Sequence, residues 1–242
     1  MIDLHAHVLP GLDDGPADLA QALALLWAMD QQGIRTVVAG AHALDGRYNA
    51  TREAVLAAAE KVNEALATGG LAIRVLPGME LFLGFDLLRA VKSGQVMGLN
   101  QSPFLLVELP HREFPHYTER ALFDLMIAGY RPILNHPERN QAIQKDPELA
   151  YRLADRGVGA MVTSSSLTGR FGPVAADLAA EFLEEGVAAY VVTDAHDLKG
   201  RAPALAEGLA VARGLGKRDQ SAEAELLRAI GGAPDAGRVV AE

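Results

Sequence analysis

The run IDLHAHVLPGLDDG, residues 2–15, places two histidines and three aspartates in and directly after a segment with the character of a β-strand. His5 and His7 are separated by one residue, and side chains two apart in a strand point to the same face. Both imidazoles should therefore point in one direction at the end of this strand. Asp13 and Asp14 follow in the next loop, so four groups could meet in one place.

Strand-like segments of this kind recur along the chain, with longer segments of helical spacing between them. The expected strands are residues 2–7, 35–39, 72–76, 104–108, 132–135, 159–163 and 188–193. The expected helices are residues 18–32, 51–67, 118–128, 147–156, 174–185, 202–215 and 222–230. Such alternation predicts an α/β fold with a parallel sheet and right-handed crossovers. The pattern alone leaves a closed barrel and an open sheet as alternatives.

Ionisable residues lie at the C-terminal ends of six of these seven strands. In chain order they are His5 and His7, His42, Glu80, Glu108, His136, and Asp194 with His196. The remaining strand ends in the hydroxyls of TSSSLTG, residues 163–169. Each motif alone has little weight, but the C-terminal ends of parallel barrel strands converge on one mouth. The sequence therefore predicts one cavity lined by imidazoles and carboxylates, joined by Asp13 or Asp14 from the first loop.

Buried carboxylates are costly unless cations compensate their charge. Imidazole and carboxylate together form the ligand set of Zn²⁺, Mn²⁺ or Fe. About nine such groups exceed the coordination of one ion and suit two or three ions bridged by carboxylates. The chain contains no cysteine, which excludes disulfides, thiolate metal sites and a cysteine nucleophile.

Composition narrows the remaining classes of function. Half of the 242 residues are hydrophobic and the net charge is −9, which argues against broad nucleic-acid or membrane-surface binding. No apolar run approaches the ~18 residues of a membrane span, and no signal peptide is recognisable, so we expect a cytoplasmic protein without membrane insertion. We expect a single domain over residues 1–242, with a loose tail at about 233–242.

Four further residues have simpler interpretations. His111 and His116 follow the fourth strand and are expected to be solvated loop histidines, with substrate contacts as the alternative. Asp3 points the same way as His5 but one layer deeper, as a buried hydrogen-bond partner. Trp27, on the first expected helix, is expected to pack in the core.

The whole set of motifs resembles the PHP (polymerase and histidinol phosphatase) family, and within it the bacterial manganese-dependent protein-tyrosine phosphatases of capsule and exopolysaccharide loci. The motifs are IDLHAHVLPGLDDG, AHALDGRYN, GMEL, VELP, NHPERN, SSSLTGRFG and TDAHDLKGR, and they reach to about Arg201. The resemblance implies a distorted (β/α)₇ TIM-like barrel, the PHP fold, with a trinuclear metal site at the strand ends.

The resemblance also implies roles for individual residues. The metal ligands would be His5, His7, Asp14, His42, Glu80, Glu108, His136, Asp194 and His196, binding three divalent ions, Mn²⁺ or alternatively Fe²⁺ or Zn²⁺. Arg139 and Arg201 would be the catalytic, substrate-binding arginines. Asp14 rather than Asp13 matches the family position, and Glu80 is favoured as the bridging carboxylate. Ala43 stands where relatives often have another histidine or a basic residue.

The implied reaction is hydrolysis of phosphotyrosine by direct attack of a metal-bound hydroxide, with no phosphoenzyme. The implied substrate is a phosphotyrosine protein, the tail of a bacterial tyrosine kinase that controls polysaccharide export. One alternative is another PHP phosphoesterase, such as a histidinol-phosphate phosphatase or a nuclease. A second alternative is a non-catalytic regulator that only binds phosphotyrosine. The sequence leaves the natural substrate and the oligomeric state open.

Overall fold

A computed structural model describes residues 1–215 and 220–231 of the chain. Its strands are all parallel to their neighbours, and the expected tail at 233–242 lies outside the described residues. The strands are β1 (Ile2–Ala6), β2 (Thr36–Ala39), β3 (Ala41–Ala43), β4 (Arg74–Leu76), β5 (Met79–Phe82), β6 (Phe104–Glu108), β7 (Arg131–Asn135), β8 (Gly159–Thr163) and β9 (Tyr190–Val192).

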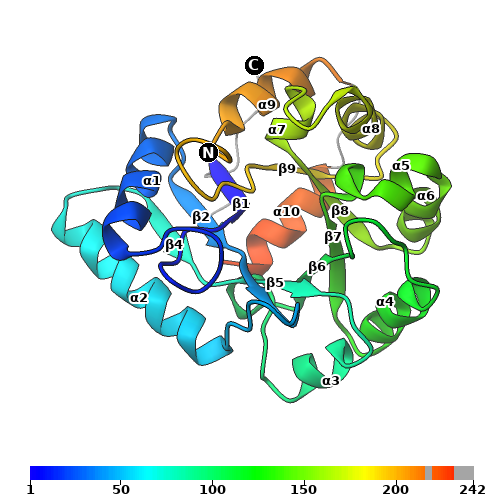
Figure 1. Ribbon diagram of the computed structural model, residues 1–242, viewed down its shortest axis with the longest axis horizontal. Coiled ribbons are helices and arrows are strands. Elements are labelled where there is room, and N and C mark those ends of the chain that lie inside the picture. The colour runs from blue at the N-terminus through cyan, green and yellow to red at the C-terminus, as the bar shows by residue number, and fades with distance from the viewer. Residues whose placement is uncertain (216–219, 232–242) are drawn as a thin grey trace.

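Helices follow most of the strands and form a ring around them (Figure 1). The seven expected helices are found as α1 (Leu19–Gln31), α2 (Arg52–Thr68), α4 (Thr118–Ile127), α6 (Glu148–Asp155), α8 (Pro173–Glu184), α9 (Leu205–Arg213) and α10 (Gln220–Ala229). Short elements escaped prediction, namely α3 (Leu87–Lys92), α5 (Gln141–Lys145), α7 (Ser164–Leu167) and the 3₁₀ turns η1 (Leu99–Gln101) and η2 (Pro137–Arg139).

The strands form two sheets, in the orders β1-β2-β4 and β3-β5-β6-β7-β8-β9. β2 and β3 are consecutive parts of one chain segment, as are β4 and β5, so the two sheets share these two segments. Backbone hydrogen bonds close the remaining gap, from His7 to Ala195 at 2.8 Å and from Asp194 to His5 at 3.0 Å. Seven chain segments thus form a closed circuit. Of the two expected alternatives, the structure shows the distorted barrel and not the open sheet.

The second and third expected strands are found as β2 and β4, and each chain segment continues, after a break at Gly40 or at Pro77-Gly78, into a further short strand, β3 or β5. A Cβ atom at Gly40 would collide with the imidazole of His5, and one at Gly78 would collide with the carbonyl oxygen of Ala39. Both breaks therefore need glycine because another group approaches the backbone closely. They also turn His42 and Glu80 into the barrel mouth on separate short strands.

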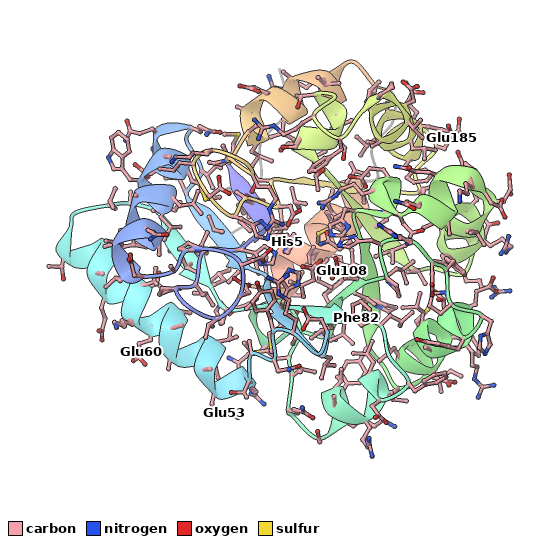
Figure 2. All side chains as sticks on the ribbon, viewed as in Figure 1. His5, Glu53, Glu60, Phe82, Glu108 and Glu185 are labelled. Atoms are coloured by element: carbon pink, nitrogen blue, oxygen red, sulfur yellow. The ribbon has the colours of Figure 1, made fainter. Side chains whose placement is uncertain are left out.

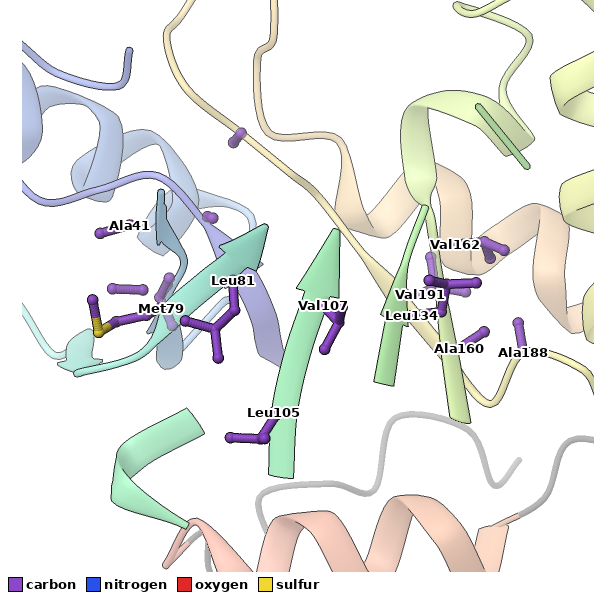
Figure 3. Packing of buried hydrophobic residues seen from close by; sticks show 14 of the residues in the cluster. Ala41, Met79, Leu81, Leu105, Val107, Leu134, Ala160, Val162, Ala188 and Val191 are labelled. Carbon is purple, nitrogen blue, oxygen red and sulfur yellow. The ribbon is translucent and has the colours of Figure 1, made fainter. Parts of the chain in front are cut away.

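The hydrophobic core has two layers, one on each face of the barrel wall. In β6, Leu105 and Val107 point outward toward the helices, as Figure 3 shows. Leu106 points inward, into a smaller cluster that includes Leu226 and Leu227 of α10. α10 lies behind the centre of the ring in Figure 1 and closes the end of the barrel where the strands begin.

The expectation that Trp27 packs in the core is wrong, because its side chain is 55% exposed. The buried face of α1 is formed by Ala22, Leu25, Leu26 and Met29. Trp27 lies about 100° around the helix from Leu26 and therefore faces outward. Over the described part of the chain, no helix combines the length and apolar character needed to cross a membrane.

Candidate metal centre

The nine residues expected as ligands converge at the end of the barrel where the strands finish. Figure 2 shows both His5 and Glu108 near the centre of the ring, although their strands β1 and β6 belong to different sheets. Seven of the nine are buried, while His42 is partly buried and the Asp14 side chain is 31% exposed. The group therefore forms a deep polar cluster with one open side, as the strand-end pattern predicts.

His5 and His7 point into the cluster together, as their spacing predicts. Their Nε2 atoms lie 3.1 Å and 3.4 Å from Asp194 Oδ1, and 3.8 Å and 3.4 Å from Glu80 Oε2. His196 stacks on His7 with ring centroids 3.7 Å apart. Three chain segments thus bring imidazole and carboxylate side chains close together.

Two residues of the cluster have left-handed backbone conformations, which residues other than glycine rarely adopt. His136 has φ 34° and ψ 53°, and Asp194 has φ 51°. His136 directly follows β7, and Asp194 is the second residue after β9. At both points the chain must turn into the barrel mouth. Left-handed residues other than glycine are costly and concentrate at functional sites.

Donor atoms in the described residues form three groups, and within each group they lie within 4.8 Å of one another. The groups are His7, Asp14, His42 and His196; His5, His7 and Glu80; and His42, Glu80 and Glu108. His7, His42 and Glu80 each belong to two groups, so the groups share ligands. Glu80 is the shared carboxylate, which agrees with its expected bridging role.

Asp13 and Asp14 have different surroundings, although they are adjacent in the sequence. Asp13 Oδ2 accepts a hydrogen bond from His7 Nδ1 at 2.8 Å, on the side of the ring facing away from Glu80. Asp14 Oδ1 lies 3.5 Å from His42 Nε2 and 3.3 Å from the Nε2 atom of His196. Asp13 therefore orients the His7 ring through its Nδ1 atom, whereas the carboxylate of Asp14 lies within the cluster itself.

Asn135 was not singled out from the sequence, yet it lies in the middle of the cluster. Its side-chain amide donates to Glu80 Oε1 and contacts His5 Nε2 at 3.0 Å. It is the last residue of β7, directly before His136, so its position at a strand end was a usable signal.

The cluster is electrostatically strained by its own carboxylates. Burial and the charge of Glu80 raise the pKa of Glu108 to about 8. Burial and the nearby Arg139 lower the pKa of His136 to about 4. His136 is therefore neutral at pH 7, as a metal ligand must be, while Glu108 holds a proton that a cation would displace.

The two expected arginines lie at the rim of this cluster. Arg139 Nη1 donates to Asp194 Oδ2 at 2.5 Å, and its side chain is 15% exposed. Arg201 Nη2 donates to Asp14 Oδ2 at 2.5 Å, and its side chain is 31% exposed. Both guanidinium groups therefore reach the open side, where an anion would enter.

The expectation of solvated loop histidines needs refinement for one of the two. His116 is exposed, and the side chain of His111 is 66% exposed. However, His111 Nε2 lies 3.7 Å from Glu108 Oε1, and its ring stacks over His136 at 6.3 Å between centroids. His111 is thus part of the rim. Asp3 is buried and accepts hydrogen bonds from Thr193, which confirms its expected role.

A closed parallel barrel with nitrogen and oxygen donors gathered at its C-terminal mouth defines the class of α/β-barrel proteins with a metal centre. A sequence model of one family, described as "Capsular polysaccharide synthesis, CpsB/CapC", matches residues 1–227. The chain belongs to this CpsB/CapC family, which confirms the resemblance to the capsule-type phosphatases.

Individual relatives agree with this assignment. The chain is 36% identical over 201 residues to tyrosine-protein phosphatase YwqE of Bacillus subtilis, covering 83% of this chain and 79% of the relative. It is 28% identical over 216 residues to tyrosine-protein phosphatase CpsB of Streptococcus agalactiae serotype V, covering 86% and 87%. A solved structure described as one of the "unique metal-dependent tyrosine phosphatases" YwqE and CpsB matches with a TM-score of 0.89, 33% identity, and 96% and 94% coverage.

Proposed function

We propose that this chain is a metal-dependent protein-tyrosine phosphatase. The observation that carries the proposal is the set of three donor groups with shared ligands, open on the side where Arg139 and Arg201 lie. The names of the relatives YwqE and CpsB support phosphotyrosine as the substrate. The phosphoprotein we propose is a bacterial tyrosine kinase of capsule or exopolysaccharide synthesis, acting in the cytoplasm, and the proposed domain spans residues 1–242.

The residues present fit a metal centre. Among the described residues, the buried polar atoms without a hydrogen-bond partner include His5 Nδ1, His7 Nε2, Glu80 Oε2 and His196 Nε2, and the last three face the cluster. Such atoms are costly unless they bind something, and divalent cations match their chemistry. We propose as ligands the nine residues His5, His7, Asp14, His42, Glu80, Glu108, His136, Asp194 and His196, for three ions, with Mn²⁺ as the first candidate.

The chain's own residues account for binding and orientation of the phosphate. When bound, divalent ions supply an acidified water as nucleophile and neutralise charge on the phosphate. Arg139 and Arg201 would each offer forked N–H donors to the remaining phosphate oxygens. The phenolate of tyrosine, with a pKa of about 10, leaves without a strong acid. His136 and His196 therefore need no role beyond that of ligands.

A comparison of substrates tests the proposed function. The purified protein, loaded with Mn²⁺, is assayed with p-nitrophenyl phosphate, a phosphotyrosine peptide and histidinol phosphate. We expect turnover of the first two, full loss on chelation, restoration by Mn²⁺, and no effect of thiol-blocking reagents, since the chain has no cysteine. Preference for histidinol phosphate would assign another phosphoesterase activity. Tight phosphotyrosine binding without turnover would assign a regulator.

We expect the affinity for Mn²⁺ to increase as the pH rises from 6 to 8. The carboxyl of Glu108 has a pKa of about 8, so below pH 8 an ion must displace its proton. One displaced proton weakens apparent affinity about tenfold for each pH unit below the pKa. Calorimetric titration of the chelated protein at pH 6, 7 and 8, in buffers of different ionisation enthalpy, counts the released protons. Glu108→Gln should remove one of them, and an affinity independent of pH would contradict the assignment.

A further inference from the structure

Phe171 lies directly against Arg139, one of the two arginines of the proposed phosphatase site. The Cζ atom of Arg139 is 4.3 Å from the centroid of the Phe171 ring, which is the geometry of a cation–π contact. The aromatic side chain is 37% exposed, although a phenylalanine in a loop would normally gain by burial. The Phe171 ring thus lies against the Arg139 guanidinium, while part of the phenylalanine remains exposed.

The loop that carries Phe171 is fixed rather than extended. Gly169 and Gly172 have φ values of 81° and 88°, and the N–H of Gly172 donates to the carbonyl oxygen of Gly169 at 3.1 Å. Arg170 and Phe171 are the two central residues of this tight turn. Helix α7 ends directly before it and helix α8 begins directly after it. The turn therefore presents the Phe171 ring from a rigid support.

A second set of contacts holds the segment of Arg139 from the other side. Glu138 is fully buried, and its Oε1 atom accepts hydrogen bonds from the N–H of Thr163 at 3.0 Å and from Ser166 Oγ at 2.7 Å. Thr163 ends β8 and caps α7, and Ser166 lies within α7. The turn η2 is thus joined to α7 by the hydrogen bonds of Glu138. The loop after α7 contacts the same turn through Phe171 and Arg139.

Within the described part of the chain, the side chain of Arg139 makes one hydrogen bond, to Asp194 Oδ2. A guanidinium has five N–H donors, so four remain to meet an anion. These donors are useful only if the plane of the group is held in one orientation, since binding otherwise costs the entropy of ordering it. A flat ring against one face fixes that plane without occupying any donor.

We infer that Phe171 is a positioning residue, which holds the Arg139 guanidinium in the plane that receives the phosphate. This inference rests on the proposed phosphatase function. Phe171 does not itself contact the reacting atoms. It acts equally on every phosphate monoester, because the phosphate and not the leaving group meets Arg139.

The test compares four variants at position 171 in the Mn²⁺-loaded protein. Phe171→Ala should raise the inhibition constant of inorganic phosphate and lower kcat/KM for p-nitrophenyl phosphate. Each change should be about 2- to 30-fold, which corresponds to the energy of a cation–π contact. Phe171→Tyr and Phe171→Trp, which keep a ring, should restore both values. Phe171→Leu, which keeps apolar bulk without a ring, should not. A purely structural role would give restoration by Leu, and this would overturn the inference.

A double-mutant cycle gives the second readout. In an Arg139→Ala background, Phe171→Ala should have no further effect on phosphate binding measured by calorimetry, because the two side chains act as one unit. Additive losses would overturn the inference. So would a Phe171→Ala loss confined to aryl phosphates, since it would place the ring against the leaving group. An inactive wild-type protein would instead contradict the phosphatase function. If the wild type is active and the Phe171 variants have the same kinetics, only the role of Phe171 is contradicted.

Discussion

Glu80→Gln should lower kcat/KM for p-nitrophenyl phosphate by on the order of 10³-fold or more, together with loss of bound metal. Glu80 belongs to two of the three donor groups, so in the proposed centre its charge would serve more than one ion. Metal-mediated charge stabilisation is worth several kcal/mol, which corresponds to at least this factor. Gln keeps the size of the side chain and an oxygen that can still accept from Asn135. Elemental analysis of metal per chain, beside steady-state kinetics, measures both effects.

A matched variant separates loss of a ligand from loss of any buried carboxylate. Asp3 is equally buried, but it bonds to Thr193 and to the backbone N–H of His5 rather than to the donor groups. Asp3→Asn should therefore retain the metal content of the wild type. Both variants should unfold in one cooperative thermal transition after chelation, which shows that the barrel is intact. A Glu80→Gln protein with full metal and more than a tenth of the activity would refute the proposed bridging role.

Arg139→Ala should show the opposite combination, with full metal content but kcat/KM lowered by about 10²- to 10³-fold. Charge-assisted, forked hydrogen bonds to a phosphate in a largely enclosed site have effects of this size. The loss should be the same for p-nitrophenyl phosphate and for a phosphotyrosine peptide, because both present the same phosphate. Arg139→Lys should recover only part of it, since a lysine offers a point charge without the fork.

Two controls accompany this experiment. Arg120→Ala removes the same charge from the outer face of α4, where Arg120 pairs with Asp124, and should leave the kinetics unchanged. Arg201→Ala should have a smaller effect than Arg139→Ala, about tenfold, because its side chain is more exposed and water screens its charge. If Arg139→Ala also lost metal, the arginine would be holding Asp194 in place rather than binding phosphate.

The strand ends made most of this site predictable from the sequence. Parallel strands converge at their C-terminal ends, so His5, Glu108 and His136 could be placed in one cavity without any knowledge of their contacts. The period of a strand predicts that His5 and His7 point together. Asp194 and His196 were paired by the same argument, but they lie beyond β9 and enter the cluster from a turn in which Asp194 is left-handed. What the sequence could not show was which neighbours these groups have. The different places of Asp13 and Asp14 depend on the path of one loop across the barrel mouth.

Other features needed the three-dimensional structure for similar reasons. Gly40 breaks a strand because the ring of His5 approaches it, a contact between residues 35 positions apart. Glu138 joins the Arg139 segment to α7, and Phe171 contacts Arg139 from the loop after α7, but neither residue has a signal in local periodicity. Trp27 was misplaced because a helix with an apolar stripe can carry an additional large apolar residue just outside that stripe.

The closure of the barrel between β1 and the segment after β9 also determines when this centre can form. His5 and His7 precede their contact Asp194 by almost 190 residues in the chain, so they are synthesised well before it. A chain still on the ribosome therefore has histidines but not the carboxylate that completes their surroundings. The proposed ions could therefore be bound fully only after the segment that carries Asp194 has been synthesised, and a product truncated before Asp194 would be a weak chelator rather than a slow enzyme.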